Sequence, residues 1–213
     1  MTSPAPLQYG QYYHIYNRGN NRENIFIEEC NYRYFLKLYA KYIEPVADTY
    51  AYCLLRNHFH FLIRIKTVEE QEKTQKTLRV SETFKPKNPS QQFGNLFNAY
   101  AKAINKAYHR TGSLFEHPFG RVLITTNTHL VWLVVYIHQN PQKHGLVDDF
   151  RLWPYSSYRA LISTKPTRLK RDDVLAWFEG LDGFQAAHRW EISEYQIASL
   201  VPDDTDPKGF KNP

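Results

Sequence analysis

Apolar and other residues alternate from Phe59 to Ile65, in a segment rich in Phe, Leu and Ile. This pattern predicts a β-strand with at least one buried face. Another strand is expected over residues 47–54, and residues 56–57 would join the two strands as an antiparallel hairpin. The aromatic and β-branched run from Tyr12 to Arg18 ends at Gly19 and predicts a further strand. A fourth strand is expected at residues 122–124.

Between these strands, apolar residues recur at intervals of three and four, which is the spacing of one helix face. A first helix is expected over about residues 30–43, ending before Pro45, and a second over about 90–108. Helical spacing returns at 128–138 until Asn140 and Pro141 stop it, and again at about 172–178.

The order strand, helix, strand, strand, helix, strand predicts an α+β fold of the ferredoxin-like, split β-α-β type. An antiparallel sheet would then have two helices on one face and the 58–65 strand near its centre. We expect a lead over residues 1–11, the main domain over residues 12–145, and a C-terminal helical extension over residues 146–213 that ends loosely. Within the domain, residues 67–90 are charged and poor in large apolar residues, which predicts a mobile connection with one helical turn or more at its start. This segment is either a solvated loop or a basic lid.

Composition narrows the classes of protein without selecting one. The 213 residues, 42% hydrophobic and 15% aromatic, suit one globular core, and the net charge of +6 favours a polyanionic partner. Many basic proteins bind no polyanion, so charge alone does not decide. Two cysteines in no C-x-x-C arrangement disfavour a disulfide framework or a thiolate zinc site and fit a reducing cytoplasm. We find no signal peptide and no run of about 18 apolar residues, so a cytoplasmic protein that neither spans nor binds a membrane is expected.

His58 and His60 lie two residues apart in the predicted central strand, so both side chains project from the same face. Two adjacent imidazoles make half of a metal site, although two polar residues on a solvated sheet face would show the same spacing. Tyr100 lies on the second predicted helix among small residues, which would leave its hydroxyl accessible. The ordinary alternative is a tyrosine at the edge of the core with a solvated hydroxyl.

Five short segments, taken together and in order, resemble a known family. They span about residues 12–158 and are YHIYNRG at 13–19, NHFHFLI at 57–63, YAKAIN at 100–105, RTGSLF at 110–115 and YIHQNP at 136–141. The set is similar to the REP-associated tyrosine transposases of the single-tyrosine HUH superfamily, in which U is a hydrophobic residue.

The resemblance implies that His58 and His60 hold a divalent cation, Mg²⁺ or Mn²⁺, and that Tyr100 is the nucleophile. The implied substrate is single-stranded DNA with a palindromic-repeat hairpin, cut through a 5′-phosphotyrosine link without ATP. A cation at the phosphate fits this chemistry, because a phenol with a pKa of about 10 is a poor nucleophile at neutral pH unless its proton is removed or its target phosphate is made more electrophilic.

The resemblance also implies a third cation ligand one helical turn beyond the tyrosine, yet that position is Ile104. Asn105 is the nearest amide, but it is rotated from Tyr100 by about 140° on a helix. The candidates for the third ligand are therefore Asn105, Asn57, Glu116, His117 and Asn98.

Basic and aromatic side chains supply candidate DNA contacts, although each could be an ordinary surface or core residue. Exposed tyrosines and Trp153 could stack on unpaired bases, and the basic run at 168–171 suits hairpin recognition by the C-terminal region. The candidates for phosphate contacts are Arg18, Arg56, Arg64, Lys102, Lys106, Arg110 and Arg121.

Three hypotheses follow from the sequence. The first is a metal-dependent DNA nicking and joining enzyme, which requires His58, His60 and Tyr100 to converge. The second is a non-catalytic nucleic-acid-binding module of the same fold, and the third is a small-molecule or metal-binding protein with no nucleic-acid role. The complete set of segments favours the first. A monomer or a homodimer would fit, and the C-terminal extension favours a monomer.

Overall fold

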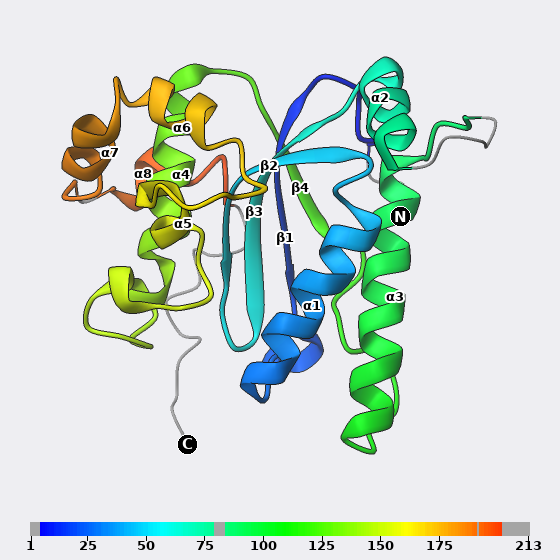
Figure 1. The fold of residues 1–213 in the computed structure, drawn as a ribbon. Coiled ribbons are helices and arrows are strands. Elements are labelled where there is room, and N and C mark those ends of the chain that lie inside the picture. Colours follow the sequence, from blue (N-terminus) through cyan, green and yellow to red (C-terminus); the bar gives the residue numbers. More distant parts are fainter. Residues whose placement is uncertain (1–4, 79–83, 191, 202–213) are drawn as a thin grey trace.

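The computed structural model describes residues 5–78, 84–190 and 192–201. Its centre is one antiparallel sheet with the strand order β2-β3-β1-β4 (Figure 1). The strands are β1 (Tyr12–Arg18), β2 (Ala47–Leu54), β3 (His58–Ile65) and β4 (Gly120–Ile124). β3 lies between β2 and β1, so the predicted α+β arrangement and the central place of the histidine strand are confirmed.

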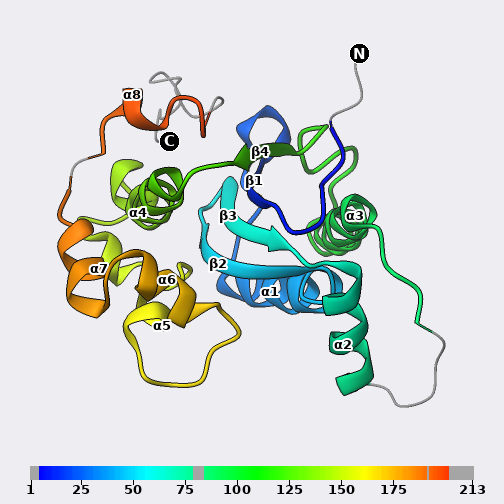
Figure 2. The same ribbon diagram turned by 90° about the horizontal axis from the view of Figure 1, so that it is seen from above.

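Helices cover both faces of this sheet. The two helices predicted for one face are α1 (Glu29–Tyr42) and α3 (Pro89–Ala107). The other face, which the sequence left unassigned, carries α4 (Asn127–Lys143) and the helices of the C-terminal extension (Figure 2). These are α5 (Tyr158–Ile162), α6 (Arg171–Trp177), α7 (Leu181–Ala187) and α8 (Glu194–Ile197).

Alternation along β3 divides the interior into two parts. Phe59, Phe61 and Ile63 belong to the core beneath α1 and α3, whereas Leu62 belongs to the core beneath α4. His58 and His60 share the parity of Leu62 and therefore face α4. We call the first side the aromatic face and the second the α4 face.

Local signals explain where the main helices begin. The Asn88 side chain accepts a hydrogen bond from the backbone N–H of Gln91, and Pro89 is the first residue of α3. Thr126 caps α4 in the same way, through the N–H of His129. These caps agree with the predicted boundaries, because polar capping residues stand directly before each apolar periodic run.

Two segments differ from expectation. Residues 68–78 form α2 (Val68–Leu78), three turns of helix, and the rest of the predicted mobile connection includes residues 79–83, which lie outside the described residues. The cause is a capping box: the N–H of Thr67 donates to the Glu70 carboxylate at 2.7 Å, and the N–H of Glu70 donates to the Thr67 hydroxyl at 3.3 Å. α4 also continues through Pro141 to Lys143, because a proline in the last turn removes only one backbone hydrogen bond.

Among the residues that the structure describes, no helix is long and apolar enough to cross a membrane. The tail from residue 202 onward, predicted to be loose, lies outside those residues.

Candidate functional site

A cluster of buried histidines occupies the α4 face of the sheet. β1 and β3 are paired so that Tyr16 lies opposite His60 and Arg18 opposite His58, which brings His14 of β1 beside His60. His14, His58 and His60 are at most 3% exposed. Burial lowers the pKa of His58 and of His60 well below 6.5, so both imidazoles are neutral at pH 7 and can act as ligands.

Hydrogen bonding fixes the tautomer of His58. Its Nδ1 lies 2.7 Å from the Asn57 side-chain oxygen, which can only accept, so Nδ1 carries the proton. The lone pair of Nε2 then faces the Asn140 side-chain oxygen at 3.5 Å. Two buried acceptors that face each other are unfavourable alone and would be stabilised by a cation between them.

His60 is oriented in a similar way, but by a more distant residue. Its Nδ1 lies 3.0 Å from Nε2 of His14, whose own Nδ1 donates to the Leu200 carbonyl at 2.7 Å. His14 Nε2 is therefore an acceptor, and His60 donates to it from Nδ1. His60 Nε2 is therefore an acceptor, as are His58 Nε2 and the Asn140 side-chain oxygen in the same cluster.

α4 adds a tyrosine that the sequence analysis did not select. Tyr136 lies one helical turn before Asn140, and its ring centroid is 5.6 Å from that of His60. Tyr136 is 3% exposed, and within the described part of the chain its hydroxyl has no hydrogen-bond partner. The Lys143 ammonium lies 5.5 Å from the centre of its ring. A buried polar group without a partner is rare in proteins and is typical of functional sites.

A small cavity of about 40 Å³ opens beside the histidines. It has room for about three water molecules, each needing about 10–15 Å³, and so for a cation with part of its hydration but not for a nucleotide. Gly120 and Tyr16 both line this cavity. The Tyr16 ring can lie against β4 only because residue 120 is glycine, since a Cβ there would overlap the ring. The polar residues of its lining are His14, Tyr16, Asn17, Arg18, His58, His60 and Glu116.

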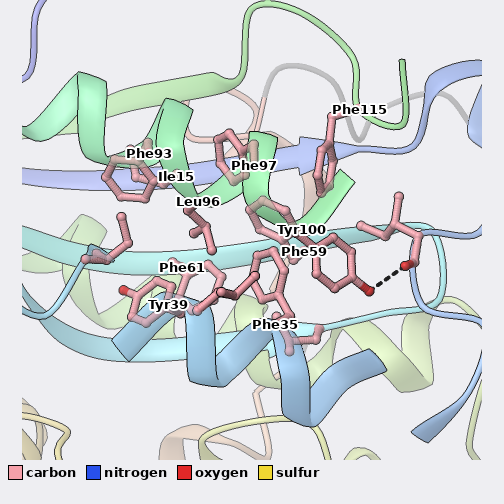
Figure 3. Packing of buried hydrophobic residues seen from close by; sticks show 14 of the residues in the cluster. Ile15, Phe35, Tyr39, Phe59, Phe61, Phe93, Leu96, Phe97, Tyr100 and Phe115 are labelled. Atoms are coloured by element: carbon pink, nitrogen blue, oxygen red, sulfur yellow. Dashed lines mark hydrogen bonds between the residues drawn. The ribbon is translucent and has the colours of Figure 1, made fainter. Parts of the chain in front are cut away.

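Tyr100, the predicted nucleophile, lies on the opposite side of the sheet (Figure 3). It is fully buried, its ring packs edge-on against Phe35 at 5.0 Å, and its hydroxyl donates to the Ile25 carbonyl at 2.7 Å. Burial also raises its pKa. This placement contradicts the predicted role. Position 100 falls on the apolar stripe of α3, so the small residues beside it in sequence do not make it accessible.

The candidates for the third ligand are also separated by the sheet. Asn105 donates to the Gly112 carbonyl at 2.9 Å at the end of α3, and Asn98 is exposed on that helix, so neither joins the histidines. His117 is exposed, whereas Glu116 lines the cavity and Asn57 orients His58. Asn140 was missed, although the required spacing was present in YIHQNP at 136–141, where an asparagine follows a tyrosine by four residues.

The predicted phosphate contacts are scattered, and among them only Arg18 lines the cavity in the described structure. Arg64 forms ion pairs with Glu70 at 3.1 Å and Asp48 at 3.4 Å, and Arg110 pairs with Glu23. Arg121 stacks on Phe119 at 3.9 Å, and Arg56, Lys102 and Lys106 are exposed. Trp153 is held by a 2.9 Å hydrogen bond to the Leu54 carbonyl. A role in DNA binding stays a prediction for all of them.

Comparisons with known proteins agree with the resemblance seen in the sequence. No protein-family model matches the chain. The chain is 30% identical over 118 residues to a Haemophilus influenzae protein named "Putative REP-associated tyrosine transposase", and the match covers 52% of this chain and 58% of that protein. The fold is similar to the solved structure of a REP-associated tyrosine transposase bound to a REP hairpin, with a TM-score of 0.56 and 16% identity over 78% of this chain and 88% of that one. The similarity to this family is thereby confirmed.

Proposed function

We propose that this chain is a metal-dependent nicking and joining enzyme for single-stranded DNA, a transposase of the REP-associated type with Tyr136 as its nucleophile. One observation carries the proposal: Tyr136 and Asn140, one turn apart on α4, meet His58 and His60 on the same face of the sheet. The named relative and the similar fold support a hairpin-forming repeat as the DNA partner.

The residues that would hold a divalent cation, Mg²⁺ or Mn²⁺, are His58 and His60 through Nε2 and Asn140 through its side-chain oxygen. They fit this role because all three are buried, uncharged acceptors and because two of them already face each other at 3.5 Å. Three protein ligands leave the remaining coordination positions to phosphate oxygens and water. When bound, such a cation neutralises charge that develops on the scissile phosphate and on the leaving oxygen.

Tyr136 supplies the nucleophilic oxygen. Its phenol loses a proton as the oxygen attacks phosphorus, the bond from phosphorus to the 3′ oxygen breaks, and the 3′ oxygen leaves as a hydroxyl. The resulting 5′-phosphotyrosine keeps the energy of the phosphodiester, so attack by a 3′ hydroxyl reverses the step and joins strands. Lys143 beside the ring favours the phenolate, because a nearby positive charge stabilises the ionised form.

Both parts of the proposed site come from one chain, since β3 carries the histidines and α4 carries Tyr136 and Asn140. We therefore propose that a monomer is sufficient for strand cleavage. Arg18, at the rim of the same cavity, would contact the scissile phosphate or its neighbour.

The test uses labelled single-stranded DNA with the hairpin repeats that flank the chain's own gene, with and without Mn²⁺. A denaturing gel reveals a covalent adduct between protein and DNA. We expect a cation-dependent adduct that Tyr136→Phe abolishes and that Tyr16→Phe, on the rim of the same cavity, retains.

Loss of the adduct in Tyr16→Phe but not in Tyr136→Phe would overturn the assignment of the nucleophile. Tight binding that weakens steeply with salt, without any adduct on the correct repeat, would contradict the enzymatic function and favour a non-catalytic binding module.

A further inference from the structure

We propose that His14 is a positioning residue, which holds His60 in the tautomer and orientation that a cation ligand requires, and that the Leu200 carbonyl fixes His14 in turn. This inference rests on the proposed function only in taking His60 as a ligand. It gives the C-terminal extension a direct part in the site.

The direction of each hydrogen bond in this relay follows from the Leu200 backbone carbonyl, because a carbonyl has only one possible role. A backbone carbonyl can only accept, so the 2.7 Å contact with Leu200 places the proton of His14 on Nδ1. His14 Nε2 is then an acceptor, and the 3.0 Å contact places the proton of His60 on Nδ1. In this tautomer His60 Nε2 carries a lone pair, and Nε2 is the atom assigned to the cation.

Packing holds the relay in place. His14 is fully buried on β1, its ring lies within 20° of the plane of the His60 ring with centroids 5.1 Å apart, and the Tyr16 ring lies beside it at 4.9 Å. Leu200 and Val201 are each 2% exposed and belong to the same hydrophobic cluster as α4. With rings and carbonyl buried, the His14 ring is not free to turn over and exchange its donor for its acceptor.

The two proposed histidine ligands are therefore oriented by different means. His58 is held by Asn57, its neighbour in sequence, whereas His60 is held through a relay that ends 186 positions from His14. The hydrogen bond that orients His58 lies entirely within the β2–β3 hairpin. The His60 half is complete only when the chain near Leu200 is docked against the sheet.

Two measurements on the full-length chain without DNA test this assignment. The first is the tautomer of His60, observed by nitrogen NMR of the imidazole in protein without metal. We expect the Nδ1–H form in the wild type and in His14→Gln, whose amide oxygen can accept the same proton. His14→Phe removes the acceptor, and we expect a mixture of tautomers.

The second measurement is Mn²⁺ affinity by calorimetric titration. Loss of a residue that orients a metal ligand weakens affinity by about 10–100-fold, so His14→Phe should show that loss and His14→Gln should recover most of it. Thermal unfolding of each variant identifies any that fails to fold, and Tyr100→Phe, on the opposite face of the sheet, serves as a packing control with unchanged affinity.

The outcomes separate the two proposals. An Nε2–H tautomer of His60 in the wild type, or wild-type Mn²⁺ affinity and an unchanged His60 tautomer in folded His14→Phe, would overturn the positioning role. If His60→Ala also leaves Mn²⁺ affinity unchanged, it is the cation site of the proposed function that fails.

Discussion

The two faces of the sheet each carry a helix with one buried tyrosine, and the two tyrosines differ in what surrounds the hydroxyl. On the aromatic face, Tyr100 of α3 donates to the Ile25 carbonyl and is enclosed by Phe rings (Figure 3). On the α4 face, Tyr136 lies beside His60, and its hydroxyl has no partner in the part of the chain that the structure describes. The same residue type stabilises the fold where its hydrogen bond is satisfied and is available for chemistry where it is not.

The surroundings of the tyrosines extend this difference. Beneath α1 and α3 the core is a continuous set of aromatic and aliphatic side chains, whereas the α4 face buries several histidines and Asn140 among its apolar residues. Burying polar groups whose bonds are incomplete costs stability, and functional sites commonly carry such a cost. We infer that packing on the aromatic face stabilises the fold and offsets the cost of burying polar groups on the α4 face.

The largest expected effect is on the aromatic face. Phe35 is fully buried and contacts Phe59 at 5.2 Å and Tyr100 at 5.0 Å. Phe35→Ala should lower the free energy of unfolding by about 3–5 kcal/mol, because it leaves a cavity in a close-packed cluster. Urea denaturation measures the change, and adduct formation by the folded fraction should be unaffected. A loss below about 1 kcal/mol would show that this face does not carry the stability.

A second effect concerns pH and the α4 face. Burial lowers the pKa of His188 to about 4, and its Nδ1 donates to the Phe184 carbonyl at 2.7 Å. The unfolded chain binds this proton near pH 6.5 and the folded chain does not, so the stabilisation is complete above pH 6.5 and is lost as the pH falls towards 4.

Across that window the loss from His188 alone is about 3 kcal/mol, at about 1.4 kcal/mol per pH unit. His188→Gln should flatten the dependence of unfolding free energy on pH by this amount, and His129→Gln, at a partly exposed histidine, serves as the control. Equal slopes for the wild type and His188→Gln would show that His188 is protonated in the folded protein at these pH values.

The sharpest comparison is one substitution made on both faces. Tyr100→Phe leaves the Ile25 carbonyl without its donor and should lower the free energy of unfolding by about 1–2 kcal/mol. Tyr136→Phe removes a buried hydroxyl that has no partner among the described residues and should raise it by up to about 1 kcal/mol. Thermal and urea unfolding under identical conditions give both values. Changes of the same sign would contradict the difference between the two hydroxyls.

The fold could be predicted from the sequence because its signals are local. The alternation in 59–65, the stop before Pro45 and the polar residues before each helix specify elements whose order matches one common topology. The helix at 68–78 was underestimated, because its start depends on a capping box of Thr67 and Glu70 within a charged segment with few apolar residues.

The candidate site could be predicted only in part. His58 and His60 share a strand, and the two-residue period places them together without knowledge of the fold. Tyr100 and Tyr136 both lie on predicted helices, and no local pattern states which face of the sheet each helix covers. The relay from His60 through His14 to Leu200 joins three distant segments, so only the packed structure could reveal it.

The most direct test of these conclusions is to identify the residue that carries the DNA. After reaction with a repeat hairpin in Mn²⁺, nuclease and protease digestion would leave a nucleotide remnant on one peptide, and mass spectrometry would locate it. We expect the remnant on Tyr136 within residues 127–143, with none on the peptide from α3. A remnant on Tyr100 would show that the two faces rearrange during the reaction and would contradict the assignment of the α4 face as the catalytic one.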